Sequence, residues 1–357
     1  MGKVLMKGNE AIGEAAIRAG CLNYFAYPIT PQSEVAEYLA RRMPEVGGVF
    51  LQGESEVAVG YMIFGAAGCG ARVFTTSSSP GISLMSEALS YITCAQCPAV
   101  FVNIMRGGPG LGGILPSQGD YFQATKGGGH GDYRLLVMAP ASVQEAVEMV
   151  MAAFPLAEKY RNPVMILGDG LIGQMMEPVA FPEDLLSEPA NKDDWATTGI
   201  GNRSGDTPNV VKSLFLDPVQ LNNHNLLLKA KYDRMRRDEV RYEAYNMDGD
   251  YRVLIVSYGT MSRVCRTAID SLKEEGLEVA MIRPQTLFPF PEKAIREAAG
   301  KEGCRLAVSI EMSMGQMVED VERSIQGRCP VEWYGKCGGE VPTPEEIVDV
   351  VRSMLQK

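Results

Sequence analysis

The chain has 357 residues, of which 46% are hydrophobic, and its formal net charge is -10 at pH 7. This length predicts two to three domains, large enough together to bury a core without disulfides. The acidic balance argues against nucleic acid or an anionic membrane as the main partner, because both bind surfaces rich in lysine and arginine. No apolar run reaches the roughly 18 residues of a membrane helix, and no signal-peptide pattern opens the chain, so we expect a cytoplasmic protein without membrane contact.

The eight cysteines lack the spacing of an iron–sulfur motif, and only Cys94 and Cys97 form a CxxC pair. This pair lies in a helical pattern that ends before Pro98, so we interpret both as buried thiols. A redox dithiol or half of a metal site is the alternative. In a reducing compartment the other cysteines should be free. We predict no metal site on this chain, and any electron-transfer cluster must lie on another chain.

Residues 1–184 alternate short apolar runs with glycine-rich turns and helical patterns. Strands are expected at residues 23–30, 46–52, 71–78, 98–106, 133–140 and 162–170. Helices are expected at residues 11–20, 33–43, 55–70 and 142–160, the last with Ser142 as its N-cap, and in the cysteine segment 83–97. This alternation predicts βαβ units and therefore a parallel sheet that is covered on both faces.

The pattern changes after residue 181. Residues 186–209 are polar and rich in glycine and proline, which predicts a long connection, and residues 221–245 resemble a charged surface helix. We therefore expect a linker at 185–247 between domains at 1–184 and 248–357. The second domain resumes the alternation, with strands at 251–260, 277–284 and 304–311 and helices at 262–276, 291–300, 315–327 and from 344 onward. It is a smaller α/β domain.

The segment YPITPQSE, residues 27–34, contains two prolines that flank Ile29 and Thr30. Proline fixes its own φ and restricts the preceding residue, so this loop should be stiff. A rigid loop beyond the carboxyl end of a parallel strand is where open α/β sheets bind ligands. The alternative is an ordinary helix start, with Thr30 as N-cap and Pro31 at the first helical position.

A second segment, FLQGESEVAVG at residues 50–60, places Glu54 and Glu56 near the start of an apolar helix. An acid at a helix N-terminus is stabilised by the helix dipole, and Glu54 fits this explanation. Glu56 fits it less well, because the following 14 residues carry no charge. A carboxylate at the head of a buried helix needs a partner or a function.

These two segments, together with TTSSSPGISLM, VNIMRGGPG, VLIVSYGTMSRVCRTAI, RPQTLFPFP and SIEMSMGQMVEDV, resemble the α-type subunit of 2-oxoacid:ferredoxin oxidoreductases. The resemblance covers nearly the whole chain apart from residues 185–245. It is greatest to the branched-chain (3-methyl-2-oxobutanoate, or 2-ketoisovalerate) members, and the α subunit of 2-oxoglutarate:ferredoxin oxidoreductase is the alternative. It implies an α/β fold in which a pyrimidine-type thiamine-diphosphate-binding domain precedes a transketolase C-terminal-like domain.

The resemblance also implies an activity, the coenzyme-A-dependent oxidative decarboxylation of a 2-oxo acid to the acyl-CoA, with the electrons passed to ferredoxin. In this family thiamine diphosphate is shared between two chains, and the present chain resembles the aminopyrimidine side. A β-type subunit would hold the diphosphate and Mg²⁺. A γ-type subunit and a ferredoxin-like subunit with [4Fe-4S] clusters would complete the complex, so the chain should not be active alone.

By the same resemblance, Glu56 is the acid that faces the ring nitrogen N1′ of the aminopyrimidine. It must be protonated there, and the apolar helix would raise its pKa by desolvation. Thr30 and Arg106 would face the substrate. A planar guanidinium can hold a carboxylate through two hydrogen bonds, which suits a 2-oxo acid. The residues expected at the cofactor are Tyr27, Pro28, Ile29, Thr30, Glu56, Ser79 and Gly81.

Two motifs point elsewhere. GPGLGG at residues 108–113 matches GxGxxG, with Asp132 at a suitable distance, so a nicotinamide-dependent dehydrogenase is an alternative. Pro116 argues against it, because it blocks the helix that should face a pyrophosphate. Asp169, in GDG, mimics the Mg²⁺–diphosphate motif of thiamine enzymes. Three prolines break the helix that this motif needs, so we expect Asp169 to be structural.

The two histidines, His130 and His224, lie far apart in the sequence and form neither a metal site nor a catalytic triad. A turn histidine is the preferred interpretation of His130, and a position at the cofactor interface beside Asp132 is the alternative. A non-catalytic, transketolase-like subunit that only shapes an assembly is a further alternative for the chain as a whole.

Overall fold

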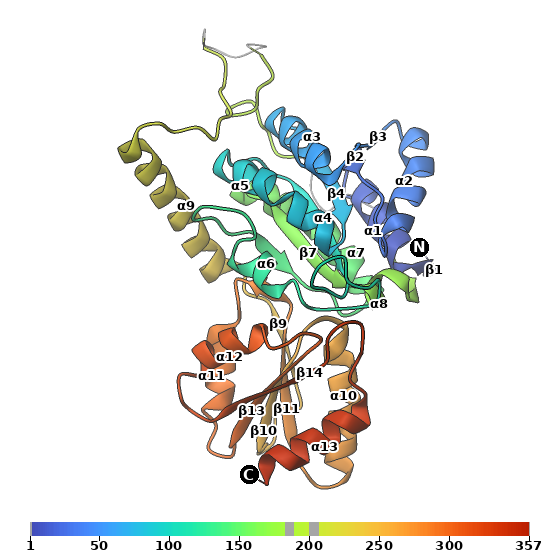
Figure 1. Cartoon of the computed structure of the whole chain (residues 1–357), viewed down its shortest axis with the longest axis vertical. Helices are drawn as coiled ribbons and strands as arrows, with labels where there is room; N and C mark the ends of the chain where they lie inside the picture. Colours follow the sequence, from blue (N-terminus) through green and yellow to red (C-terminus); the bar gives the residue numbers. More distant parts are fainter. Residues whose placement is uncertain (1, 183–188, 200–206, 357) are drawn as a thin grey trace.

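The computed structural model describes residues 2–182, 189–199 and 207–356, which form two α/β parts stacked along the long axis of the molecule (Figure 1). The strands in this part of the chain are β1 (Val4–Lys7), β2 (Asn23–Ala26), β3 (Val49–Gln52), β4 (Val73–Ser77), β5 (Val100–Met105), β6 (Leu136–Met138), β7 (Val164–Asp169), β8 (Met176–Val179), β9 (Tyr242–Tyr245), β10 (Val253–Val256), β11 (Val279–Pro284), β12 (Thr286–Phe288), β13 (Leu306–Glu311) and β14 (Val331–Gly335). The helices are α1 (Gly8–Arg18), α2 (Ser33–Glu45), α3 (Glu56–Gly68), α4 (Ser79–Leu84), α5 (Ser86–Cys94), α6 (Tyr121–Lys126), α7 (Val143–Tyr160), α8 (Gly170–Gln174), α9 (Pro218–Asp238), α10 (Gly259–Glu274), α11 (Glu292–Ala299), α12 (Met317–Ile325) and α13 (Pro344–Leu355).

The larger sheet has, within the described residues, seven strands in the order β12-β6-β7-β5-β4-β2-β3. Neighbouring strands are parallel except β12, which is antiparallel to β6. Helices α3 and α5 pack together on one face, and α1 and α7 pack together on the other (Figure 1). Strands β5 and β7 are buried along their whole length, as the apolar runs in their sequences require. The predicted parallel sheet with two covered faces is confirmed.

Side-chain caps explain where two of the helices begin. The Ser142 hydroxyl accepts a hydrogen bond from the backbone N–H of Glu145 at 3.1 Å, so the predicted N-cap of α7 is confirmed. Ser55 does the same for α3, accepting from the N–H of Ala58 at 3.2 Å. This cap makes Glu56 the first residue of α3, directly after strand β3 and its short turn.

The smaller sheet has, in the described part of the chain, five strands in the order β14-β13-β10-β11-β9. The strands expected at 251–260, 277–284 and 304–311 are β10, β11 and β13, and they are mutually parallel. β14 extends this sheet in parallel beside β13, and β9 pairs with β11 in the antiparallel direction. Neither β9 nor β14 was expected from the sequence.

The segment between the two sheets differs from its prediction at its C-terminal end. The expected connection at 186–209 lies partly outside the described residues. Helix α9 follows it, but the prediction that this helix continues to residue 245 is wrong, because Tyr242–Tyr245 form β9. Strand β12 in turn brings residues of the C-terminal part into the larger sheet. The division into 1–184, 185–247 and 248–357 stays a prediction. No helix in the described residues is long and apolar enough to cross a membrane.

The two sheets are joined by buried polar contacts. Gln118 donates from Nε2 to the carbonyl of Tyr258 at 2.9 Å and accepts at Oε1 from the N–H of Met312 at 2.9 Å. Arg283 forms a bidentate pair with Glu145, with distances of 2.7 and 2.8 Å. These contacts hold the smaller part of the molecule against the larger one.

Lys231 ties α9 to the larger part of the molecule. Its side chain is buried, and Nζ donates to the carbonyl of Arg161 at 3.0 Å and to Oε1 of Gln96 at 3.4 Å. Burial lowers the pKa of Lys231 to about 7, and the nearby Arg161 and Arg234 guanidinium groups lower it further. The folded chain therefore prefers the neutral amine at a position where the unfolded chain is charged.

We expect Lys231→Met to raise the thermal midpoint of the assembled enzyme most near pH 7, and the gain to shrink towards pH 10. In the unfolded chain Lys231 keeps its proton up to its ordinary pKa, whereas in the folded chain it loses the proton near pH 7. The free energy of unfolding of the wild type therefore rises with pH between these two pKa values. The slope is about 1.4 kcal/mol per pH unit. Thermal melts of wild type, Lys231→Met and the exposed control Lys229→Met across this range test it. A gain independent of pH would contradict the expectation.

Candidate functional site

The residues singled out in the sequence meet at one edge of the larger sheet. The loop at 27–32 follows β2, Ser79 follows β4 and Arg106 follows β5, and these three strands are parallel. Glu56 begins α3, directly after β3. Their carboxyl ends therefore lie along the same edge, which is where open α/β sheets bind ligands.

Arg106 is buried but has no acidic partner. Its side chain is 7% exposed, and it donates from Nη1 to the carbonyl of Thr30 and from Nη2 to the carbonyl of Leu111, both at 3.0 Å. Among the described residues no carboxylate forms an ion pair with it, and its Nε is buried without a hydrogen-bond partner. A buried cation that only backbone carbonyls contact favours an anionic ligand. The structure thus brings Arg106 and Thr30 together.

Glu56 lies against Gly81 at the start of α4. The Glu56 side chain is 7% exposed, and no hydrogen bond or ion pair to its carboxylate is present within the described residues. A Cβ atom at position 81 would lie 2.8 Å from Glu56 Oε1 and 2.1 Å from the hydroxyl oxygen of Ser77. Glycine is therefore needed at position 81 for the close approach of α4 to Glu56 and Ser77.

The loop at 27–32 is held by Gln32, which the sequence did not single out. The buried Gln32 side chain donates from Nε2 to the carbonyl of Tyr27 at 3.3 Å and accepts at Oε1 from the Thr76 hydroxyl. Helix α2 begins only at Ser33, with Gln32 as its N-cap, so the alternative with Thr30 as N-cap is wrong. Pro28 and Thr30 are exposed, and Ile29 is half-buried. The loop thus presents its tip at the sheet edge.

Several buried polar atoms at this edge lack partners. The hydroxyl oxygens of Ser77 and Ser78, Oδ1 of Asn103 and Nε of Arg106 are buried without a hydrogen bond in the described part of the chain. Ser77 and Asn103 are direct neighbours on β4 and β5. Buried polar groups are normally satisfied, because an unmade hydrogen bond costs about 1–3 kcal/mol. Their concentration at one sheet edge is typical of a ligand site.

Asp120 is a residue of this edge that the sequence analysis missed. Its Oδ2 accepts from the Ser79 hydroxyl at 2.6 Å and from Asn103 Nδ2 at 2.8 Å. Burial raises the pKa of Asp120, while the hydrogen bonds from Ser79 and Asn103 oppose this shift. The Ser79 hydroxyl oxygen also accepts from the backbone N–H of Arg106 at 3.0 Å. Asp120 thereby links the expected pocket residue Ser79 to the end of β5, and no local pattern marks it.

A cleft of about 510 Å³ opens between this edge and the smaller sheet. The larger part contributes Ser79, Arg106, the glycine loop and Asp120. The opposite wall comes from loops of the smaller part, and its residues are Ser313, Met314, Gln316, Cys337 and Gly338. The sequence did not predict that the smaller part contributes to the cleft wall, although Ser313, Met314 and Gln316 lie in the segment SIEMSMGQMVEDV that resembles the family.

The glycine loop at 108–113 does not have the geometry of a dinucleotide site. It forms a hairpin, in which the N–H of Gly107 donates to the carbonyl of Leu115 at 3.0 Å and Arg106 bridges to Pro116. The next helix is the six-residue α6, which begins only at Tyr121. The loop therefore does not lead directly into a helix whose N-terminus could bind a pyrophosphate, so the dehydrogenase alternative lacks its structural basis.

The remaining candidates have structural roles. Asp169 is buried, caps α8 by accepting from the N–H of Leu171 at 3.0 Å, and contacts the Thr260 hydroxyl across the interface of the two sheets, as expected for a structural residue. Burial raises its pKa. His130 is exposed and packs edge-on against Tyr91, and the ring of His224 stacks on Phe215.

All eight cysteines are free thiols, as predicted. Cys97 is buried and Cys94 half-buried, and Cys94 is the last residue of α5, so the interpretation as packed thiols fits better than a redox pair. Desolvation raises the pKa of Cys97 to about 12, so the thiol stays protonated near neutral pH. In the described residues no three His, Cys, Asp or Glu side chains are grouped to hold a metal ion.

Comparison with known proteins decides the family. Residues 14–234 match the family model described as "Pyruvate flavodoxin/ferredoxin oxidoreductase, thiamine diP-bdg". The chain belongs to the 2-oxoacid:ferredoxin oxidoreductase family. Residues 252–347 match "Pyruvate:ferredoxin oxidoreductase core domain II". A relative in Methanothermobacter thermautotrophicus, "Ketoisovalerate oxidoreductase subunit VorB", is 48% identical over 99% of this chain and 98% of its own length.

Solved structures support the same assignment. The chain superposes with a TM-score of 0.85 and 29% identity on a "2-oxoglutarate:ferredoxin oxidoreductase from Magnetococcus marinus with 2-oxoglutarate, coenzyme A and succinyl-CoA bound", covering 99% of this chain and 65% of that one. A "Split gene transketolase, inactive beta4 tetramer" shares the fold, with a TM-score of 0.61 and 16% identity over 98% of both chains. The α/β fold with a thiamine-diphosphate-binding domain and a transketolase-like second part is confirmed. The chain is an oxidoreductase subunit that acts on 2-oxo acids within a multi-subunit complex.

Proposed function

We propose that this chain is the α-type subunit of an enzyme that oxidatively decarboxylates 3-methyl-2-oxobutanoate to the acyl-CoA and passes the electrons to ferredoxin. The observation that carries the proposal is the buried Arg106, which has no acidic partner in the described residues and lines the cleft at the sheet edge. The 48% identity to a relative named for ketoisovalerate supports the branched-chain substrate.

The charges of the cleft support a monocarboxylic substrate. Arg106 is the one cation among the described residues that line the cleft, and Asp120 is an acid on the same wall. A 2-oxoglutarate molecule would bring a second carboxylate without a second cation to bind it. Pro80, Pro109 and Met314 supply apolar surface to the cleft, which suits an aliphatic side chain. We therefore prefer 3-methyl-2-oxobutanoate over 2-oxoglutarate, the substrate named in the Magnetococcus structure.

In this proposal Arg106 binds the carboxylate of the 2-oxo acid, and Thr30 faces the substrate from the adjacent loop. The hydrogen bond from Arg106 to the Thr30 carbonyl keeps this loop next to Arg106, which lines the cleft. The backbone N–H of Arg106 donates a hydrogen bond to the Ser79 hydroxyl oxygen, so Ser79 fixes the backbone of Arg106. Asp120 holds the Ser79 hydroxyl in turn, so it positions the substrate residues without a role in the chemistry.

The residues at this edge fit the aminopyrimidine half of thiamine diphosphate. When bound, this cofactor supplies the electron sink that makes loss of the substrate carboxylate as carbon dioxide possible. Glu56 would hold its proton on a carboxyl oxygen and donate it in a hydrogen bond to the ring nitrogen. The residues proposed to contact the cofactor are Tyr27, Pro28, Ile29, Thr30, Glu56, Ser79 and Gly81. The unpaired hydroxyls of Ser77 and Ser78 at this edge fit a polar ring of this kind.

We further propose that a β-type subunit holds the diphosphate and Mg²⁺, and that a γ-type and a ferredoxin-like subunit with [4Fe-4S] clusters complete the enzyme. Asp169 resembles the metal-binding aspartate of thiamine enzymes, but in this chain its carboxylate caps α8 and contacts Thr260. We therefore expect the metal to be bound by another chain. The eight free thiols agree with a reducing, cytoplasmic location.

An anaerobic purification of the tagged chain from its native host tests the proposal. We expect it to co-purify with Fe–S and thiamine-diphosphate-binding chains. The assembly should reduce viologen in a coenzyme-A-dependent reaction, with a higher kcat/KM for 3-methyl-2-oxobutanoate than for 2-oxoglutarate. A preference for 2-oxoglutarate would overturn the substrate but keep the family. A complex without any 2-oxo acid activity would overturn the proposed function.

A further inference from the structure

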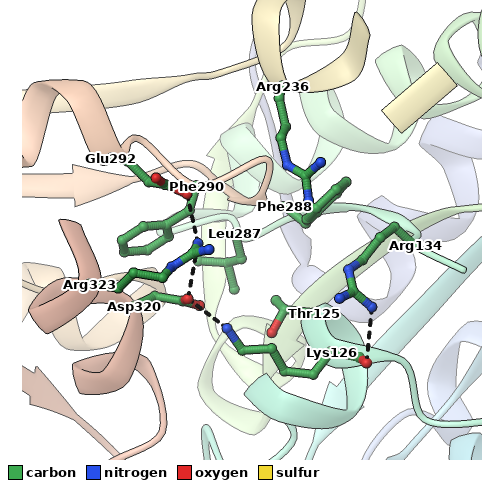
Figure 2. Close-up of a pocket in the computed structure, with 10 residues that line it drawn as sticks. All are labelled: Thr125, Lys126, Arg134, Arg236, Leu287, Phe288, Phe290, Glu292, Asp320 and Arg323. Carbon is green, nitrogen blue, oxygen red and sulfur yellow. Dashed lines mark hydrogen bonds and ion pairs between the residues drawn. The ribbon is translucent and has the colours of Figure 1, made fainter. Parts of the chain in front are cut away.

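A second pocket lies away from the cleft, where the larger sheet, α9 and the smaller part of the molecule meet (Figure 2). Its volume is about 110 Å³. Its apolar lining consists of Leu287 and Phe288, which belong to β12, and Phe290, which follows this strand. The rim carries four cations and two carboxylates, which are Lys126, Arg134, Arg236, Arg323, Glu292 and Asp320.

The two carboxylates neutralise only two of these cations. Lys126 Nζ contacts Asp320 Oδ1 at 2.6 Å, and Arg323 Nη2 contacts Glu292 Oε1 at 2.6 Å. Asp320 is further engaged by the buried Tyr121 hydroxyl, which donates to its Oδ2 at 2.6 Å. Both acids of the pocket are therefore already paired within it.

The two remaining arginines have no carboxylate in the pocket. Arg134 donates from Nη1 to the carbonyls of Tyr133 at 3.0 Å and Lys126 at 3.1 Å, and no acid of the described residues pairs with it. Arg236 lies over the Phe288 ring at 5.1 Å, and it forms an ion pair with Asp233 on its own helix, at 3.0 Å. Figure 2 shows both guanidinium groups reaching toward the space beside Thr125 and Leu287.

We propose that this pocket binds the phosphoryl group of an anionic ligand, with Arg134 and Arg236 as its principal contacts. Two of the four cations around this hollow pair with its two carboxylates, and Arg236 shares Asp233, which does not line the hollow, with Lys229. Positive charge therefore remains in excess around the hollow, and an anion between Arg134 and Arg236 would offset it. Arginine suits this role because its planar fork matches the oxygens of a phosphoryl group.

The size of the pocket narrows the ligand class. At about 110 Å³ it is well below the roughly 300–1,000 Å³ of sites that enclose whole small molecules. It therefore accepts one tetrahedral oxyanion, either inorganic phosphate or the phosphoryl end of a larger molecule such as coenzyme A. The phosphate contact is independent of the proposed substrate, because none of the pocket residues lines the cleft that contains Arg106.

Equilibrium dialysis of the assembled enzyme against radiolabelled inorganic phosphate tests the pocket. We expect wild type to bind phosphate, and Arg134→Gln and Arg236→Gln each to weaken binding by about tenfold or more, as for loss of a charged hydrogen bond. The matched control is Arg237→Gln, since Arg237 is adjacent on α9 but pairs with Asp238 outside the pocket. Co-purification of the partner chains and unchanged thermal midpoints verify that the variants are folded.

Competition separates the two sources of the phosphoryl group. Displacement of phosphate by coenzyme A, but not by dephospho-coenzyme A, together with a raised KM for coenzyme A in Arg134→Gln, identifies the 3′-phosphate of this co-substrate as the ligand. Phosphate binding that both compounds leave intact identifies free phosphate. Equal binding in wild type and both arginine variants, or no binding in wild type, overturns the proposal. None of these outcomes depends on which 2-oxo acid the enzyme prefers.

Discussion

Glu56→Gln is expected to lower kcat of the assembled enzyme by about 10²-fold or more, the usual loss when an acid–base group is removed. The amide has the size of the carboxyl but cannot hold an acidic proton. No group in the described residues forms a hydrogen bond or ion pair with the Glu56 carboxylate, so the exchange removes no such interaction from the folded chain. The measurement is coenzyme-A-dependent viologen reduction at saturating 2-oxo acid and coenzyme A.

The control for this variant is Glu54→Gln, two residues earlier and exposed. It makes the same carboxyl-to-amide exchange near the same helix terminus but outside the proposed cofactor site, so it should keep full activity. Wild-type turnover by Glu56→Gln would remove Glu56 from the mechanism and favour a subunit that only shapes the assembly. Reduced turnover with an unchanged thermal midpoint would separate a catalytic loss from a folding loss.

The elements with strong local signals were predicted well. Helix α7 carries a clear helical pattern after Ser142, and β5 and β7 are continuous apolar runs, so both their type and their place agree with the structure. Strands β1 and β8 were missed because each has only four residues and half or more of each is not buried. Their pairing joins Val4 to Val179, a contact that no local periodicity encodes.

The same contrast holds for the site. Glu56 and Arg106 are marked locally, one by a charge before an apolar helix and the other by a cation between a strand and glycines. No local pattern marks Gln32 or Asp120, because their roles depend on hydrogen bonds with Thr76 on β4 and Asn103 on β5, which are distant in the sequence. The cleft wall at Met314 likewise arises only when the smaller sheet packs on the larger one.

Arg106→Lys is expected to raise KM for every 2-oxo acid by roughly 10- to 100-fold, while KM for coenzyme A stays close to wild type. Charged hydrogen bonds contribute about 1.5–3 kcal/mol, and lysine keeps the charge but lacks the planar fork. Arg106 uses two nitrogens to reach the Thr30 and Leu111 carbonyls, whereas a lysine side chain has only one nitrogen. The ammonium group therefore cannot contact both carbonyls and also bind a carboxylate in the same geometry. Steady-state kinetics with varied acid measure the change.

Arg41→Lys is the matched control, because Arg41 is exposed on α2 and makes no ion pair in the described part of the chain. A structural role for Arg106 would lower kcat and the thermal midpoint and would affect acid and coenzyme A alike. A role in binding the carboxylate is selective, since only the 2-oxo acid carries the group that Arg106 is proposed to contact. Unchanged KM for all acids would therefore place Arg106 outside the substrate site, and its uncompensated charge would then need a different anion.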